Sequence, residues 1–279
     1  MDGRADVMKN RSAIKTVNWI APLFILGLII FGQTVEALIL AVSYTVYRII
    51  VDLSKIYSYI AVKHYVSGHL QKARRYYKKA SETRVKEPPV IASYAYILIL
   101  LGEYDQAAEV LDKLDEIKFE GKTVTSVKLC RAIMSWKVGK NLSLAISTLE
   151  NLEDNLKNQW FYNILARLYI FSGDLEHAKK IAAEGYEYLN TNINAIENLL
   201  VIHCINEDWV KAKSAADKII KGKRKMLPSS MDAYYFAGLA YEKSGQDEDA
   251  ARMYEKALEY EHTTMTYIDS ESVLGKGRI

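Results

Sequence analysis

The chain of 279 residues is poor in the side chains that most often build a catalytic or metal site. Its two cysteines, Cys130 and Cys204, lie far apart and lack the close spacing of metal ligands. Its five histidines are scattered, and it has neither a phosphate-cradling glycine-rich loop nor a Gly-x-Ser-x-Gly segment. No nucleophile and base can be named together, so the sequence predicts neither an enzyme nor a bound cofactor. The cysteines fit reduced, buried residues of a cytosolic domain.

Positive charge is missing from one long stretch near the start. No Lys or Arg lies between Lys15 and Arg48, and residues 17–31 and 35–51 are mostly apolar. At 1.5 Å per residue these segments reach roughly 22 and 25 Å, at the short limit for a hydrocarbon core of about 30 Å. Gly32-Gln33-Thr34 between them is polar and favours a turn. We therefore predict a transmembrane helical hairpin over residues 17–53, preceded by a basic tail at residues 1–16.

Three alternatives stay open for this region. A single span from Trp19 to about Val42 places Gln33 and Glu36 in the bilayer, where a central carboxylate costs about 3 kcal/mol. A cleaved signal peptide fits the basic start, but its only small-residue cleavage site, Val35-Glu36-Ala37, is poor and hydrophobicity resumes after it. A buried hairpin in a soluble protein needs a larger core than the rest of the chain offers.

Basic residues flank the apolar region on both sides. Residues 54–87 alone hold nine Lys or Arg against two Glu, although the whole chain has a net charge of only +3. The positive-inside rule therefore predicts a multi-pass protein of the cell membrane with both flanks in the cytoplasm, the alternative being a single-pass protein. This distribution suits anionic lipid headgroups better than nucleic acid. The predicted membrane-surface patch consists of Lys72, Arg74, Arg75, Lys78 and Lys79.

A short pattern recurs six times in the rest of the chain: a small or turn residue, a polar residue, a bulky residue, two further positions and an alanine. The first position is Gly68, Gly102, Lys140, Gly173, Glu207 and Gly245. The alanines are Ala73, Ala107, Ala145, Ala178, Ala212 and Ala250, at steps of 34, 38, 33, 34 and 38 residues. A period near 34, with apolar residues at helical spacing on both sides of each turn, predicts stacked helix–turn–helix units.

The pattern resembles the tetratricopeptide repeat. The last copy matches its consensus at Gly238, Tyr241, Gly245, Ala250, Tyr254 and Ala257, while Lys140 and Glu207 depart from it. The resemblance covers residues 54–260 and implies an all-α fold: a solenoid of about six helix-turn-helix repeats following the hairpin. Residues 261–279 are then expected to form a flexible tail, and an irregular helical bundle is the alternative.

The resemblance also implies a concave groove, lined by the first helix of each repeat, that binds a protein or peptide. Carrying the inward positions over from the turns gives Tyr96, Met134, Lys137, Trp160, Asn163, Arg167, Asn194, Glu197 and Tyr235. Such a mixture of aromatic and polar groups suits an extended peptide, although these side chains can equally be solvated without a ligand. Two functions stay open: a membrane-tethered adaptor or scaffold that uses this groove, and a structural subunit whose hairpin packs against partner transmembrane helices.

Overall fold

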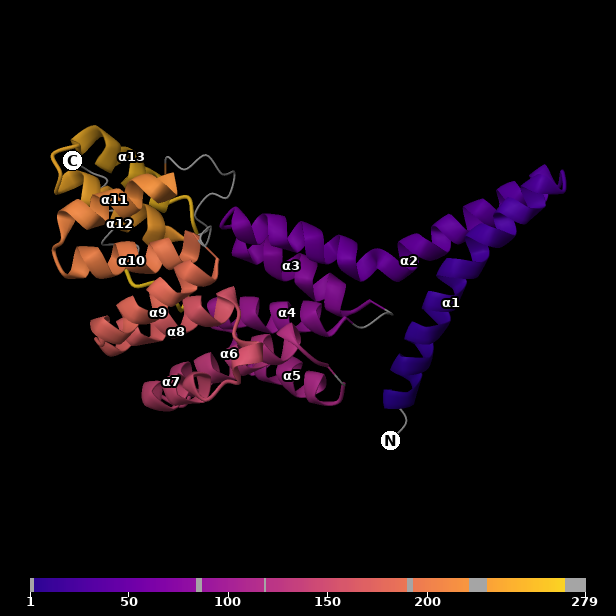
Figure 1. The fold of residues 1–279 in the computed structure, drawn as a ribbon, viewed down its shortest axis with the longest axis horizontal. Helices are drawn as coiled ribbons and strands as arrows, with labels where there is room; N and C mark the ends of the chain where they lie inside the picture. The colour runs from indigo at the N-terminus through magenta and orange to yellow at the C-terminus, as the bar shows by residue number, and fades with distance from the viewer. Residues whose placement is uncertain (1–2, 84–86, 118, 190–192, 221–229, 269–279) are drawn as a thin grey trace.

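The computed structural model describes residues 3–83, 87–117, 119–189, 193–220 and 230–268. Over these residues the chain forms thirteen α-helices and one 3-10 helix, and no strand. Helices α1 (Gly3–Ile30) and α2 (Thr34–Val66) form a hairpin that projects from one side of the molecule (Figure 1). The other elements are α3 (Leu70–Ser81), α4 (Pro88–Leu100), α5 (Tyr104–Asp115), α6 (Lys122–Lys137), α7 (Leu142–Glu150), the 3-10 helix (Asp154–Leu156), α8 (Gln159–Ser172), α9 (Leu175–Tyr188), α10 (Ile193–Ile205), α11 (Trp209–Ile220), α12 (Met231–Glu242) and α13 (Asp247–Ala257).

The six predicted turns join six helix pairs, from α2–α3 to α12–α13. Each has its first residue in the left-handed region, with φ of 77° at Gly68, 78° at Gly102, 55° at Lys140, 81° at Gly173, 55° at Glu207 and 72° at Gly245. Glycine adopts this conformation freely, whereas any other L-residue does so at a cost of roughly 1–2 kcal/mol. The turn positions predicted from the repeated pattern are therefore confirmed, including the two where glycine is replaced.

Small residues let the two helices of each pair approach closely. All six patterned alanines are buried, and a Cβ added to Gly238 of α12 would lie only 2.7 Å from the Tyr254 ring on α13. Successive first helices also pack together, α4 on α6 and onward through α8 and α10 to α12, so one apolar cluster runs through the array. The all-α solenoid predicted from the sequence is confirmed.

Helix α2 belongs to both the hairpin and the first repeat. It continues without interruption from Thr34 to Val66, so the predicted boundary at residues 53 and 54 lies inside a helix and is not a break. Just past that point the buried Ser54 Oγ donates a hydrogen bond of 3.0 Å to the Ala80 carbonyl at the end of α3. The first half of α2 pairs with α1, and its second half is the first helix of the first repeat.

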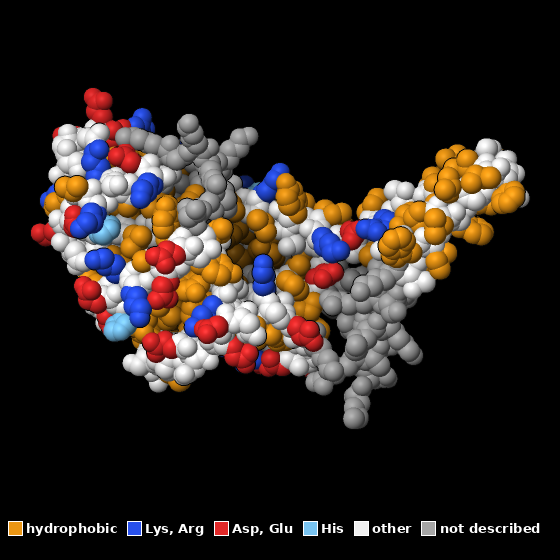
Figure 2. Space-filling model, in the orientation of Figure 1, with side chains coloured by type: hydrophobic (Ala, Val, Ile, Leu, Met, Phe, Trp, Pro, Cys, Tyr) orange, Lys and Arg blue, Asp and Glu red, His pale blue; other side chains and the backbone are white. Residues whose placement is uncertain are grey.

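Apolar side chains cover the hairpin and face outward. Trp19 is 78% exposed and Phe31 83% exposed, and Figure 2 shows hydrophobic side chains crowding this arm while charged ones spread over the repeats. Among the described residues, α2 is long and apolar enough to cross a membrane by length and composition, whereas the apolar stretch Thr16–Ile30 is shorter. The helical hairpin is therefore present, and its crossing of a membrane twice stays a prediction.

The end of the described chain differs from the flexible tail expected from residue 261 onward. Residues 261–268 pack against the inner side of the repeats, and Met265 is only 2% exposed. The physical reason is a set of backbone and side-chain hydrogen bonds to α4 and α12. Residues 269–279 of the predicted tail lie outside the described residues.

Candidate functional site

An open cleft of about 560 Å³ lies on the inner surface of the array. Its walls come from α3, the middle of α4, the first turns of α6, α8 and α10, and the ends of α2 and α9. Four of the nine predicted groove residues line it: Tyr96, Trp160, Asn163 and Asn194. The register carried over from the turns thus brings these four side chains, from three different helices, to one concave site.

Local contacts hold Trp160 in place at the start of α8. The Asn158 side chain caps this helix by accepting hydrogen bonds from the backbone N–H groups of Trp160 (2.9 Å) and Phe161 (3.1 Å). The Trp160 ring then packs edge-on against the Tyr96 ring, with centroids 4.6 Å apart. Both the backbone and the ring of this half-buried tryptophan are therefore positioned before any ligand arrives.

The cleft is nearly neutral. Lys122 is the one charged side chain among the described residues that line it, and Tyr65, Tyr77 and Tyr96 supply phenol rings. Burial raises the pKa of Tyr77 to about 12 and also raises the pKa values of Tyr65 and Tyr96, so these phenols stay protonated near neutral pH. An aromatic, hydrogen-bonding wall with a single cation suits a segment that is neutral or carries an acidic group.

Two other predicted groove residues, Arg167 and Glu197, do not line the open cleft. They are 8% and 3% exposed, and the Arg167 guanidinium pairs with the Glu197 carboxylate at 3.3 Å and with Asp232 of α12. The Ser230 hydroxyl also donates to Glu197, at 2.7 Å. A buried charge must be paired to remain charged, so this cluster joins α8, α10 and α12 instead of facing solvent. The expectation that they are open groove residues is corrected, because they are buried in this cluster.

Burial perturbs the acid of this cluster. It raises the pKa of the Asp232 carboxyl to about 6, although the Arg167 guanidinium beside it acts in the opposite direction. The Asp232 oxygens also accept the backbone N–H of Tyr267, at 3.0 and 3.2 Å. The cluster therefore lies directly beneath the returning end of the chain.

The remaining three predicted groove residues lie away from the cleft. Lys137 Nζ is 3.4 Å from the centroid of the Trp136 ring, and burial lowers the Lys137 pKa to about 8. Tyr235 packs against the Tyr254 ring of α13, with centroids 5.6 Å apart, and Met134 is a half-buried residue packed on the core. These side chains consolidate the helix pairs and are not among the residues lining the cleft.

Residues 260–268, which we call the C-terminal strap, cross the inner surface next to the cleft. The Glu261 N–H donates to the Gly68 carbonyl at 3.4 Å, at the turn of the first repeat. The Thr264 N–H donates to the Leu100 carbonyl at 2.9 Å, at the end of α4. With the Tyr267 N–H on Asp232, the strap connects the first, second and last repeats.

The predicted membrane-surface patch is altered at one position. Arg74 is half-buried and bonded to the Glu103 carboxylate at 2.6 Å, so it joins α3 to the next repeat. Lys72, Arg75, Lys78 and Lys79 are exposed on α3, and Lys79 Nζ lies over the Tyr57 and Tyr76 rings, 5.9 and 5.6 Å from their centroids. Four of the five predicted cations thus remain at the surface.

The sequence reasoning missed Asp232 as a structural partner and missed the strap altogether. A signal for the first was present, because Arg167, Glu197 and Asp232 all occupy inward positions in their repeats and carry complementary charges. The strap has no such signal, since two of its hydrogen bonds join backbone groups, which every residue possesses. Within the described residues no group of three or more His, Cys, Asp or Glu is arranged to hold a metal ion.

Known proteins support the repeat assignment. The family model described as "Tetratricopeptide repeat" matches residues 232–262, the last helix pair. The TPR repeat-containing protein MJ1428 of Methanocaldococcus jannaschii is 27% identical over 155 residues, which cover 55% of this chain and 27% of that protein. The chain thus spans about a quarter of the length of that relative.

Two solved structures of repeat proteins overlap this chain in part. A tetratricopeptide repeat protein from Parabacteroides merdae has a TM-score of 0.49 and 14% sequence identity, with 92% of this chain and 96% of that chain covered. YrrB, described as a TPR protein with an unusual peptide-binding site, has a TM-score of 0.38 and 16% identity, with 73% of this chain and 98% of that chain covered. The last helix pair thus matches the tetratricopeptide repeat model, and a longer part of the chain is similar to a curated repeat protein.

Proposed function

We propose that the chain is a membrane-tethered adaptor whose repeats bind an extended segment of a partner protein in the aromatic cleft. The observation that carries the proposal is the convergence of Tyr96, Trp160, Asn163 and Asn194 on one open concave site. Tetratricopeptide repeats generally mediate interactions between proteins, and solenoids use their concave surfaces for this purpose.

The tether rests on the dimensions of α2 and on the exposed apolar surface of the hairpin. Residues 34–51 span about 27 Å as a helix, close to the thickness of a hydrocarbon core, and residues 52–66 continue for about 22 Å beyond it. Confinement near a bilayer raises the effective concentration of the cleft for partners in the same membrane. We expect the protein to stay with membranes through high-salt and carbonate washes, and its release by carbonate would remove the tether from the proposal.

Orientation follows from charge. The basic residues that flank the apolar hairpin favour a cytoplasmic location for the repeats at the cell membrane. The Ser54–Ala80 hydrogen bond places the end of α3, with Lys78 and Lys79, at the level where α2 leaves its apolar stretch. Lys72 lies about 10 Å further along α3, beyond a Debye length of about 8 Å. Lys78 and Lys79 are therefore the cations best placed for anionic headgroups.

The cleft offers a partner one well-anchored aromatic surface and several hydrogen-bonding groups. Tryptophan is among the residues that most often dominate binding energy, and its truncation at such a site typically costs about 2 kcal/mol or more. Asn194 and Lys122 also line it and supply an amide and a cation. A partner segment with an aromatic or apolar side chain next to an acidic or neutral polar group fits this arrangement.

Partner capture by the full chain in mild detergent tests the proposal. Trp160→Ala is expected to weaken capture at least tenfold, whereas Trp209→Ala is expected to leave it unchanged. Trp209 is a matched control because it is also half-buried but lies on α11, outside the cleft. Two charge reversals give a second comparison: Lys122→Glu in the cleft, and Lys113→Glu on α5 as its control.

Two results would count against the adaptor. Equal effects of Trp160→Ala and Trp209→Ala on capture would remove the cleft as the binding site. A complex of fixed stoichiometry that survives high salt and is insensitive to both variants would instead favour the structural subunit, held by its hairpin.

A further inference from the structure

We propose that the C-terminal strap, residues 260–268, is an intramolecular ligand. It occupies the inner surface as a segment of a partner protein would, and it is displaced when a partner segment binds. This inference rests on the proposed function, because it names the chemistry of the segment that the inner surface takes. That segment is a peptide that turns at Thr264 and Met265, where the Thr266 N–H donates to the Thr263 carbonyl at 3.1 Å, and it carries a threonine, a large apolar residue and an aromatic residue in the order of Thr264, Met265 and Tyr267.

Backbone recognition of the strap uses carbonyl groups at the C-terminal end of α4. The Thr264 N–H donates to the Leu100 carbonyl at 2.9 Å, and the Thr264 hydroxyl donates to the Ile99 carbonyl at 2.8 Å. Both acceptors are in the last turn of α4, where carbonyls lack the i+4 partner of a continuing helix; the Ile99 carbonyl also accepts the Gly102 N–H at 3.0 Å. A segment that turns here and presents an N–H and a hydroxyl from one residue can repeat this contact, so it selects serine or threonine.

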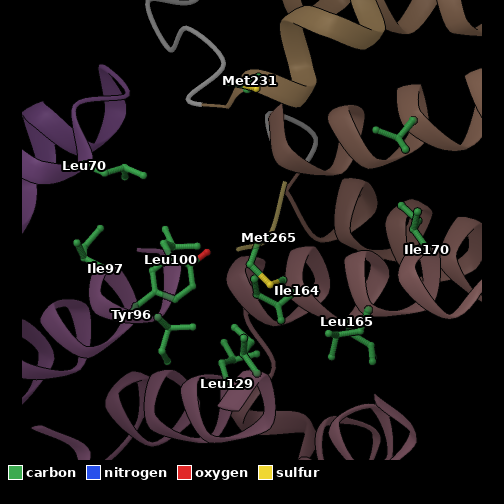
Figure 3. Packing of buried hydrophobic residues seen from close by; sticks show 14 of the residues in the cluster. Leu70, Tyr96, Ile97, Leu100, Leu129, Ile164, Leu165, Ile170, Met231 and Met265 are labelled. Carbon is green, nitrogen blue, oxygen red and sulfur yellow. The ribbon is translucent and has the colours of Figure 1, made fainter. Parts of the chain in front are cut away.

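Side-chain recognition of the strap uses one apolar pocket and one aromatic position. Met265 is 2% exposed and points into the cluster formed by Tyr96, Leu100 and Ile164 (Figure 3). The Tyr267 ring lies against the Arg167 guanidinium carbon, 4.4 Å from the ring centroid. The Tyr267 ring also packs against the Phe171 ring, with the two ring centroids 4.7 Å apart. These are the contacts by which repeat grooves would hold a peptide in trans.

The strap and the open cleft form one continuous surface. A small cavity of about 50 Å³ lies under the strap, and four residues line both this cavity and the cleft: Tyr65, Tyr96, Asn163 and Asn194. A partner segment seated against Trp160 therefore reaches the edge of the strap. Because a tethered segment competes at millimolar effective concentration, a free peptide of the same sequence is at a disadvantage. A partner overcomes this by adding contacts in the cleft.

The test uses the full chain in detergent and a fluorescent synthetic peptide of residues 259–268 as the probe. Met265→Asp places a charge in an apolar pocket and is expected to release the strap, so the variant should bind the probe at least tenfold more tightly than the natural chain. His262→Asp is the matched control, because His262 is exposed within the strap, and it should bind the probe no better than the natural chain.

Hydrogen exchange on the natural chain gives a second readout that needs no variant. Saturating probe is expected to speed exchange at the Thr264 and Tyr267 amides several-fold, while a probe with aspartate in place of methionine has no effect. A folded Met265→Asp variant that ignores the probe, or strap amides that the saturating probe leaves unchanged, overturns the proposal. Neither readout involves Trp160 or a natural partner, so failure here leaves the capture test of the adaptor unaffected, and the reverse also holds.

Discussion

The substitution Gly68→Ala tests whether Tyr260 packs against the turn of the first repeat. Gly68 has φ of 77°, and a Cβ there would lie 2.9 Å from Tyr260 Cε1 and 3.0 Å from Tyr260 Cγ. Real Cβ atoms rarely approach other atoms so closely, and the contact involves the base of the ring, which cannot swing away by itself. Gly68→Ala therefore combines backbone strain with a steric clash.

Comparison with Gly173→Ala separates the cost of backbone strain from the cost of the steric clash. Gly173 has φ of 81° but nothing within 4 Å of an added Cβ, so its substitution carries the strain alone, about 1–2 kcal/mol. Overpacking against Tyr260 adds about 1–3 kcal/mol at Gly68. We therefore expect Gly68→Ala to lower the free energy of unfolding by about 2–5 kcal/mol, measured by urea unfolding of the full chain in detergent and followed by helical circular dichroism.

A double-variant cycle completes the test. Combining Gly68→Ala with Tyr260→Ala removes the ring that the new methyl meets, so the pair should be less destabilising than the sum of the single changes. Equal losses for Gly68→Ala and Gly173→Ala, together with additivity in the cycle, would show that Tyr260 does not close on the first repeat.

Three further predictions follow from the cluster and the turns. Arg167→Met leaves two buried carboxylates without their cation and should lower the free energy of unfolding by about 3–5 kcal/mol. Its control, Arg131→Met at an exposed ion pair, should lower it by less than about 1 kcal/mol. Similar losses for the two variants would mean that the cluster is solvated. Lys140→Gly and Glu207→Gly should each raise the unfolding free energy by about 1 kcal/mol by removing left-handed strain, and a lower midpoint in urea would contradict this. Because burial raises the Asp232 pKa to about 6, the folded state binds more protons than the unfolded state between that pH and about 4. The contribution of Asp232 to stability should therefore fall as pH rises through this window, and a urea-midpoint profile from Asp232→Asn that keeps the natural slope would refute the assignment.

The repeat could be predicted from the sequence because its turns leave a mark at every copy. Gly68, Gly102, Gly173 and Gly245 are needed for their left-handed conformation, and the buried alanines fix the register of each second helix. Lys140 and Glu207 adopt the same conformation without glycine, which shows that the array imposes the turn geometry on them. Local chemistry repeated at a period is the kind of information that a single sequence carries well.

The ligand surface could be predicted only in part. Trp160 and Asn194 line the cleft as expected, because their inward position follows directly from the helical register. Arg167 and Glu197 do not, because their exposure depends on Asp232 and on the strap, which are distant in sequence. A register shows which way a side chain points, and it does not show what else arrives to cover it.

Because α2 is continuous, the number of residues in it sets the direction in which the cleft faces around the hairpin. An α-helix advances about 100° and 1.5 Å per residue, so one residue inserted between Val51 and Ser54 would swing the repeats by about 100° around the helix axis. Seven inserted residues would return the repeats to within about 20° of their original bearing, about 10 Å further from the hairpin. In the proposed membrane-tethered adaptor, a partner embedded in the same membrane would then meet the cleft from the correct side but at the wrong height. The length of this one helix therefore sets both the direction in which the cleft faces around the hairpin and its distance from the hairpin.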